Sequence, residues 1–252
     1  MKLKKWNEYF AQNKTNTLAV VKDDHALTAE ERNRISSSIQ SFQLGESSEG
    51  LILKKQALRF CEGVGSYEYL EAIKHLIREE NRHSAYLGQF MDLHQIGKIK
   101  KGINDTVFRF LRRLMGVEQS IRVLVTAEVI AITYYDCLSV ATESNLLKQI
   151  CKRMHDEEIV HVDFQMQQIH WMNFQKHALS SAVSNILHYF LFCTALVPVW
   201  LEHKNVLKMK YTFKSFFLKA KTDFVEATYN GQIVAAKKLV QEGFLKQEAL
   251  CI

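Results

Sequence analysis

The sequence predicts an all-α fold because turn-forming residues are scarce and four long segments show helical periodicity. Only one of the 252 residues is proline and ten are glycine, too few for a protein of many short strands. Apolar residues recur every three or four positions in four segments: 28–62, 66–94, 118–142 and 147–174. We therefore expect a four-helix bundle, with a long connection between its second and third helices and extra helices at the C-terminus.

The first helix is expected to begin at Thr28, which is followed three residues later by Glu31. This spacing is typical of a capping box, in which side chains satisfy the free amides of a helix start. Its apolar face continues without a clear stop until Gly63 and Gly65. The second helix then follows from about Ser66 to His94.

The remaining segments are expected to complete the bundle and extend it. Residues 95–117 form the long connection, with a short helix after Asn104 or Asp105. We expect three regions: an N-terminal extension over 1–27, the bundle over 28–175 and a C-terminal helical extension over 176–252. Residues 178–201 contain no Asp, Glu, Lys or Arg, and six lysines lie between 204 and 221 without an acidic residue among them. Segment 178–221 therefore either packs on the bundle or contacts a membrane surface.

Composition and charge indicate a cytoplasmic protein, with membrane association as the alternative. The fractions of hydrophobic (47%) and charged (24%) residues are ordinary for a globular protein. The five cysteines show no C-x-x-C spacing, and the basic start has no apolar run behind it. A net charge of +6 suits a generic soluble surface, and no nucleotide-binding or RNA-binding motif is present. We therefore expect no nucleic-acid partner.

Glutamate stands three residues before histidine twice, as Glu80 with His83 and as Glu158 with His161. Residues at this spacing share one face of a helix, and here that face is otherwise apolar. A buried ionised carboxylate needs a partner, because its desolvation costs several kcal/mol. A metal cation is such a partner, and mixed carboxylate and imidazole ligands suit iron or manganese.

Positions along the expected hairpins add one glutamate from each preceding helix. Glu128 and Glu158 lie equally far from a turn near residue 143, so they share one height in an antiparallel pair. Glu49 and Glu80 lie equally far from a turn between residues 64 and 65. Glu46 shares the inward face with Glu49 but lies one turn further from the break. We therefore expect Glu49 to be the ligand, with Glu46 as a neighbour or an alternative ligand.

The motifs "EENRH" (79–83) and "DEEIVH" (156–161) resemble those of the ferritin-like di-iron carboxylate superfamily, over about residues 29–174. "EENRH" is similar to the second-helix motif of soluble acyl-carrier-protein desaturases. The resemblance implies a bacterial branch near the oxygenase-type members and a ferritin-like bundle that holds two iron ions, or manganese and iron. Glu80 and Glu158 would be the bridging, catalytic pair among the implied metal ligands: Glu49, Glu80, His83, Glu128, Glu158 and His161.

The resemblance also implies a set of supporting residues. Glu157 would bond the metal-bound His83, and Glu79 would bond His161. Other polar residues are expected to play lesser parts. His155 is expected to be a solvated histidine near the helix start rather than an extra ligand, and Tyr86 and Tyr135 are expected to be packing aromatics rather than redox groups.

The function expected from this resemblance is dioxygen activation by an oxidase or oxygenase. Its partners would be O2, an unidentified organic substrate and an external electron donor, with a homodimer also considered. The absence of a rubredoxin-like cysteine cluster argues against rubrerythrin-type chemistry, and the extension beyond residue 175 argues against a ferritin cage. The alternatives are a ferroxidase or iron-handling protein, a membrane-associated di-iron oxidase, and a non-enzymatic bundle with buried ion pairs.

Overall fold

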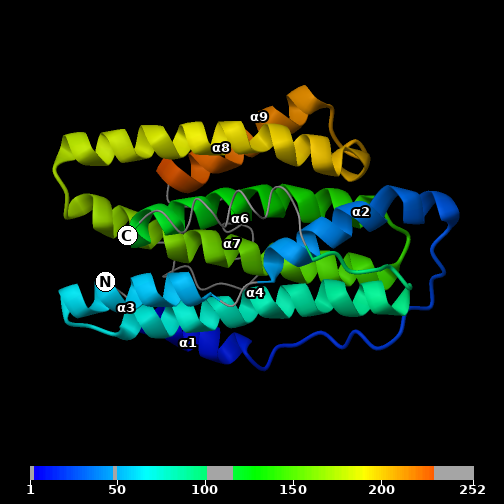
Figure 1. Cartoon of the computed structure of the whole chain (residues 1–252), viewed down its shortest axis with the longest axis horizontal. Coiled ribbons are helices and arrows are strands. Elements are labelled where there is room, and N and C mark those ends of the chain that lie inside the picture. The colour runs from blue at the N-terminus through cyan, green and yellow to red at the C-terminus, as the bar shows by residue number, and fades with distance from the viewer. Residues whose placement is uncertain (1–2, 48–49, 101–115, 230–252) are drawn as a thin grey trace. The chain divides into compact units, whose positions relative to one another are not determined.

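The described part of the protein is all-α, as predicted. The computed structural model describes residues 3–47, 50–100 and 116–229, which contain helices and no strand (Figure 1). The helices are α1 (Leu3–Asn13), α2 (Ala29–Glu46), α3 (Leu51–Val64), α4 (Glu68–Leu93), α6 (Val117–Val140), α7 (Asn145–Phe174), α8 (Ala178–Leu207) and α9 (Phe213–Tyr229). The predicted short helix after Asn104 or Asp105 lies outside the described residues, and the ferritin-like form of the bundle stays a prediction.

The chain forms two compact units. Unit 1 comprises Met1–Ser120 and Leu138–Cys151, and unit 2 comprises Ile121–Cys137 and Lys152–Ile252. Helices α6 and α7 therefore each contribute residues to both units. The expected boundaries after residues 27 and 175 remain predictions.

The first bundle helix expected from the sequence is two helices in the structure. α2 ends at Glu46 and α3 begins at Leu51, because the four residues between them, "SSEG", include serine and glycine, which form helices poorly. Gly50 adopts a left-handed conformation with φ 61°, and a Cβ at this position would collide with the Ile77 side chain. Glycine is the residue that tolerates both constraints. Glu49, the expected ligand, lies outside the described residues.

Unit 1 is built around α4, which α1, α2 and α3 all contact. Gly65, at φ 72°, closes the end of α3 and reverses the chain into α4, so that the two helices run side by side in opposite directions (Figure 1). α4 has the periodicity predicted for the second bundle helix. Its buried stripe includes Ile73, Leu76, Leu87 and Phe90, and α2 and α3 supply the buried apolar residues Ile35, Ile39, Ala57 and Cys61.

Helix α1 lies within a segment that we expected to be only a polar extension. Leu3, Trp6 and Phe10 are buried at the spacing of one helix face, and the helix packs against α4. At its last residue, the Asn13 side-chain amide donates a 2.7 Å hydrogen bond to Glu79 Oε1. A short apolar stripe among many charged residues was the signal that the sequence analysis missed.

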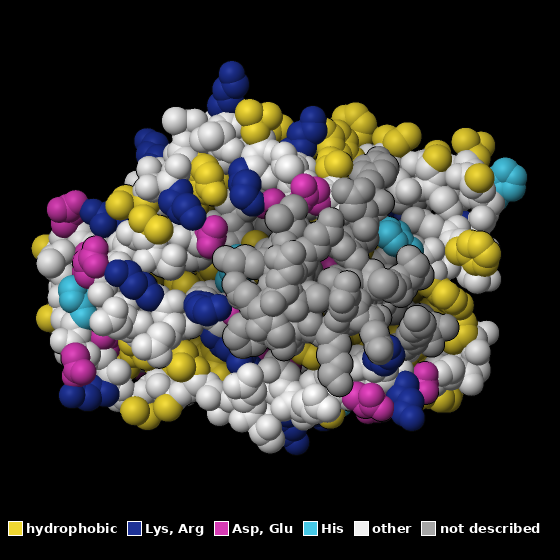
Figure 2. All heavy atoms as spheres, turned by 180° about the vertical axis from the view of Figure 1, so that it is seen from behind, with side chains coloured by type: hydrophobic (Ala, Val, Ile, Leu, Met, Phe, Trp, Pro, Cys, Tyr) yellow, Lys and Arg dark blue, Asp and Glu magenta, His cyan; other side chains and the backbone are white. Residues whose placement is uncertain are grey.

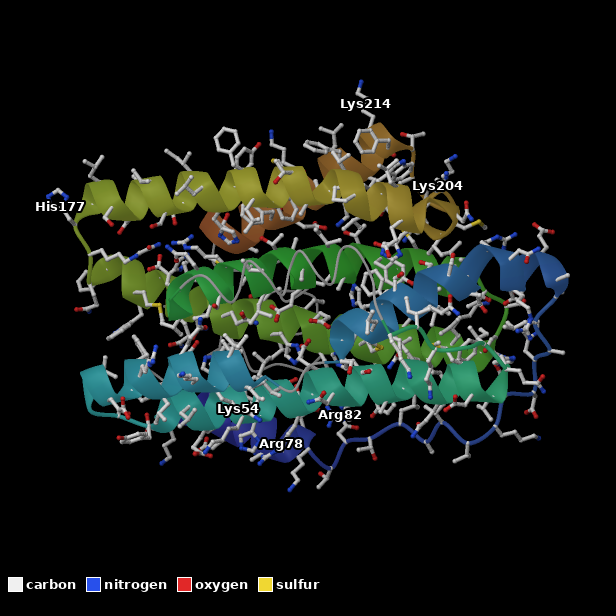
Figure 3. All side chains as sticks on the ribbon, in the orientation of Figure 1. Lys54, Arg78, Arg82, His177, Lys204 and Lys214 are labelled. Atoms are coloured by element: carbon white, nitrogen blue, oxygen red, sulfur yellow. The ribbon has the colours of Figure 1, made fainter. Side chains whose placement is uncertain are left out.

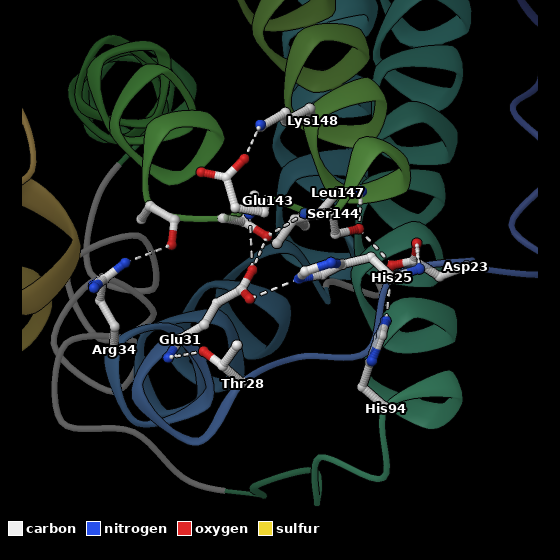
Figure 4. Close-up of polar contacts among 12 residues, drawn as sticks. Asp23, His25, Thr28, Glu31, Arg34, His94, Glu143, Ser144, Leu147 and Lys148 are labelled. Carbon is white, nitrogen blue, oxygen red and sulfur yellow. Dashed lines mark hydrogen bonds and ion pairs between the residues drawn. The ribbon is translucent and has the colours of Figure 1, made fainter.

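A polar network ties the segment before α2 to the turn between α6 and α7, within unit 1 (Figure 4). Thr28 accepts the amide of Glu31 at 3.2 Å, which confirms the predicted N-cap. The Glu31 carboxylate accepts hydrogen bonds from the Thr142 hydroxyl (2.5 Å) and the Glu143 amide (2.9 Å), and contacts His25 at 2.8 Å. The Glu31 side chain therefore serves mainly to join the start of α2 to the turn between α6 and α7.

Asp23 forms the second half of this network. Its Oδ2 accepts the hydroxyl of Ser144 and lies 2.9 Å from His94 Nε2. Burial alone would raise the pKa of Asp23, but the bonds from Ser144, the His25 amide and His94 outweigh it and lower the pKa. The segment is thus fixed to both the end of α4 and the start of α7.

Unit 2 contains α8 and α9, which pack against each other. Phe192 of α8 stacks on Phe224 of α9 at a centroid distance of 4.2 Å. Arg122 of α6 donates to His188 of α8 at 3.3 Å and to Asn173 of α7 at 3.1 Å. These contacts confirm a helix in the predicted 178–201 segment.

Candidate functional site

Unit 1 brings together two carboxylates and an imidazole, which we call the unit 1 triad. Glu46 stands at the end of α2, and Glu80 and His83 stand on α4, with ligand atoms within 4.8 Å of one another. His83 is fully buried, Glu46 is buried and Glu80 is half-buried. The Nδ1 atom of His83 lies 3.7 Å from Glu46 Oε2.

Contacts one turn away hold Glu46 against α4. The Gln43 side-chain amide donates to Ser84 Oγ at 2.8 Å, and the Ser84 hydroxyl donates to the carbonyl of Gln43 at 3.0 Å. Because Gln43 precedes Glu46 by three residues and Ser84 follows His83, this pair of bonds fixes the end of α2 beside the histidine.

Unit 2 contains an equivalent group, the unit 2 triad. Glu128 of α6 joins Glu158 and His161 of α7, again with ligand atoms within 4.8 Å of one another. All three side chains are buried. His161 Nδ1 lies 3.3 Å from Glu158 Oε2. The Gln165 amide, one turn further along α7, donates to Glu128 Oε1 and so orients that carboxylate.

The donor chemistry of both triads fits a metal ion. Each triad offers two carboxylates and one imidazole, so with neutral histidine it balances the charge of one divalent cation. Burying two carboxylates together without such a cation would be costly. Oxygen and imidazole nitrogen ligands suit iron and manganese, and they do not by themselves select one of these metals.

Glu79 and Glu157, the expected partners of the two histidines, are both buried and both contact arginine on their own helix. Glu79 Oε1 lies 3.4 Å from Arg82, and Glu157 Oε1 lies 2.5 Å from Arg153. The two arginines were not singled out from the sequence, because ion pairs along a helix are usually surface features. Asn13 was not singled out either. The bonds expected from Glu157 to His83 and from Glu79 to His161 stay predictions.

The other polar residues considered from the sequence have local roles. The Tyr86 hydroxyl accepts the Leu18 amide at 2.9 Å and so anchors the segment after α1. Tyr135 is fully buried and meets Tyr134 edge to face. His155 is partly exposed and lies 3.3 Å from Asp156. These contacts describe packing and surface interactions.

One further acidic group of unit 2 is Asp163, two residues after His161. Its side chain is 5% exposed, and burial raises its pKa to about 7. A carboxyl group in this state is partly protonated near neutral pH. Because residues two apart do not share a helix face, this partly neutral carboxyl lies on a different side of α7 from His161.

The expectation that Glu49 is a ligand depends on one unbroken first helix. The structure interrupts that helix immediately after Glu46, so counting residues back from the Gly63–Gly65 turn does not give heights in α2. Glu46 is in the unit 1 triad. Glu49 lies outside the described residues, and its role stays a prediction. No family model matches the chain, and no curated protein or solved structure is significantly similar to it.

Proposed function

We propose that the protein is a dioxygen-activating oxidase or oxygenase whose two triads together hold a pair of iron ions, or manganese and iron. The observation that carries the proposal is the duplication of one buried ligand set. Each unit combines a glutamate of one helix with a Glu-x-x-His pair of another. The resemblance of both motifs to the ferritin-like di-iron carboxylate superfamily supports the same reading.

The charge of the ligand set supports two metal ions rather than one. Four carboxylates and two neutral imidazoles carry four negative charges, which two divalent cations neutralise. A single divalent ion would leave two negative charges of the set in excess, and an excess charge in a buried site costs several kcal/mol. As the resemblance implies, Glu80 and Glu158 would be ligands to both ions, and each histidine would be a ligand to one.

Such a metal pair, when bound and reduced, supplies the electrons with which O2 is activated toward an organic substrate. The chain's own residues position the ligand side chains and keep water away from them. Gln165 orients Glu128, and the Gln43–Ser84 pair fixes Glu46. Apolar side chains along α4 and α7, including Leu76, Leu87 and Met154, exclude water from the triads.

Metal analysis of the purified chain tests the proposal. Protein expressed with both iron and manganese available should contain about two metal ions per chain, as the charge argument requires. Glu80→Ala in unit 1 and Glu158→Ala in unit 2 should each remove both ions, because the ions share ligands. Glu71→Ala is the matched control, since Glu71 is an exposed glutamate of α4 and contacts Lys74.

Other outcomes of that analysis would decide against the proposal. Loss of one ion from each variant would indicate two separate mononuclear sites. Unchanged metal content in both variants would show that the triads are not the ligands, and would leave an all-helical protein with buried ion pairs.

The reaction requires a second experiment. Iron-loaded protein should be reduced, exposed to O2 and followed optically, with the iron that leaves the protein measured afterwards. An oxygenase or oxidase should keep its iron and return to the reduced form on a second addition of reductant. Accumulation of ferric iron well beyond the ligand capacity would instead indicate iron storage.

A further inference from the structure

Helix α8 exposes an apolar stripe along one face. Seven large apolar side chains on it are exposed at intervals of one, three, four or seven residues, which is the spacing of a single helix face. From first to last, the stripe is ~33 Å long at 1.5 Å per residue. Its members are Leu179, Val183, Ile186, Leu187, Phe190, Val197 and Leu201. Figure 2, which views the protein from behind, shows hydrophobic side chains along its upper edge, the edge at which α8 and α9 lie in Figure 1.

The opposite face of α8 is fixed to the protein. Phe192, Leu196 and Val199 are buried there, and Phe192 stacks on α9. His188 on the same side accepts a hydrogen bond from Arg122, which is itself 4% exposed. A helix that crosses a bilayer alone would have to face lipid on all sides, whereas α8 has polar contacts with protein on one side.

Two helices of the described residues, α6 and α8, are long and apolar enough to cross a membrane. They differ in burial, since 72% of the most apolar window of α6 is buried inside the protein but only 28% of that of α8. α6 therefore has the character of a core helix. Packing inside the protein does not account for the apolar surface of α8, because most of it is exposed.

Lysines surround the C-terminal end of the stripe. Lys204 and Lys208 follow Leu201 on the exposed side of α8, and Lys214 lies at the start of α9. Figure 3 shows Lys204 and Lys214 projecting outward near the α8–α9 connection. Among the described residues, none of these three lysines has an acidic partner.

Two other lysines of the region form ion pairs, so the six lysines between residues 204 and 221 are not all without acidic partners. Lys210 lies 3.1 Å from Asp136, and Lys219 lies 2.5 Å from Asp223. Of the four lysines that remain, three lie around the α8–α9 connection, and the fourth, Lys221, lies over the Tyr189 ring at 5.8 Å from its centroid. The apolar stripe of α8 therefore ends beside a group of positively charged side chains.

We propose that α8 lies in the interface of an anionic lipid bilayer, with its apolar stripe inserted at the acyl boundary and the lysines at the α8–α9 connection facing anionic headgroups. The combination of an exposed apolar face and a cationic flank is that of a surface-binding amphipathic helix. Anionic lipid adds an attraction that depends on salt, because exposed charges are screened. This inference does not depend on metal binding.

Vesicle sedimentation of the full chain tests the proposal. The protein should bind phosphatidylcholine vesicles that contain phosphatidylglycerol, and bind phosphatidylcholine alone at least tenfold more weakly. Leu187→Glu should weaken binding at least tenfold, because it places a charge in the stripe. Leu51→Glu is the matched control, since Leu51 has the same exposure as Leu187 (63% and 62%) but lies on α3.

Charge reversal tests the cationic flank separately. Lys204→Glu should reduce binding to phosphatidylglycerol vesicles about tenfold and should leave the weak binding to phosphatidylcholine unchanged. Lys55→Glu is the control, because Lys55 is an exposed lysine of α3, far from α8 in the sequence. Both variants should retain the circular dichroism of the unmodified protein.

Four outcomes would overturn the proposal. Absence of vesicle binding, or equal binding by the Leu187→Glu variant, would show that the stripe does not meet lipid. A dimer that Leu187→Glu dissociates, without vesicle binding, would show that a second copy covers the stripe. Bound protein that resists an alkaline wash would indicate insertion across the bilayer rather than docking at its surface.

Discussion

The His83 imidazole lies 3.7 Å from the Glu46 carboxylate, at the residue where α2 ends. This contact connects a helix terminus to the middle of α4, and the Gln43–Ser84 bonds one turn away maintain it. The α2–α3 interruption thus places the glutamate of the unit 1 triad at a helix end that these bonds hold against α4.

Replacing Glu46 by Gln should lower the metal content of the protein, because the amide keeps the shape of the side chain but not its charge. We expect loss of at least half of the bound metal in equilibrium dialysis. Glu49→Gln should have the smaller effect. If Glu49→Gln instead causes the larger loss, the ligand expected from the sequence is correct and Glu46 only supports the site.

Gly50→Ala should destabilise the protein by about 1 to 3 kcal/mol. The residue has φ 61°, and a methyl group there would collide with the Ile77 side chain. Urea denaturation followed by circular dichroism measures the change. Gly63→Ala is the control, since a Cβ there has no atom within 4 Å and Gly63 lies inside α3. A neutral Gly50→Ala variant would show that the α2–α3 interruption is not fixed by this glycine.

The long helices could be predicted from the sequence because periodicity extends over many residues and errors at single positions matter little. The interruption after Glu46 could not, since serine and glycine weaken a helix without always ending it, and the apolar pattern continues beyond them into α3. Helix α1 was missed for the opposite reason. Its stripe of Leu3, Trp6 and Phe10 is short, and tertiary packing on α4 supplies its stability.

The candidate site shows the same division between local and long-range information. Glu80 with His83 and Glu158 with His161 are adjacent on their own helices, so spacing alone indicates that each pair converges. The Asn13–Glu79 bond joins residues 66 positions apart, and no local pattern encodes it. Glu31 shows the risk of a local motif, because its carboxylate bonds Thr142 instead of completing a capping box.

Stability should fall in acid as the Asp23 and Glu31 network is protonated. Burial would raise the pKa of Glu31, but bonds from His25, Thr142 and the Glu143 amide outweigh it and lower the pKa from 4.5. The same balance lowers the pKa of Asp23 from 3.8. Because the folded values lie below the unfolded ones, the unfolded state binds more protons at low pH. The network therefore stabilises the fold above pH 4.5, and this contribution is lost as the pH falls through the folded values.

Glu31→Gln should flatten this pH dependence, as measured by the free energy of unfolding in urea at a series of pH values. Glu30→Gln is the control, because Glu30 is the neighbouring residue and its side chain is 84% exposed. An unchanged slope in the Glu31→Gln variant, with the usual slope in the control, would assign the acid sensitivity to other carboxylates.

Docking of α1 should contribute substantially to the stability of unit 1. The Phe10 ring is 1% exposed and stacks on His75 at a centroid distance of 6.5 Å. Phe10→Ala should cost about 3 to 5 kcal/mol, because it removes a buried ring and leaves a cavity against α4. Gln12→Ala, on the exposed side of α1, should change the free energy of unfolding by less than about 0.5 kcal/mol. Urea denaturation of both variants measures the difference. Equal stability of the two would show that α1 is a dispensable addition to the fold.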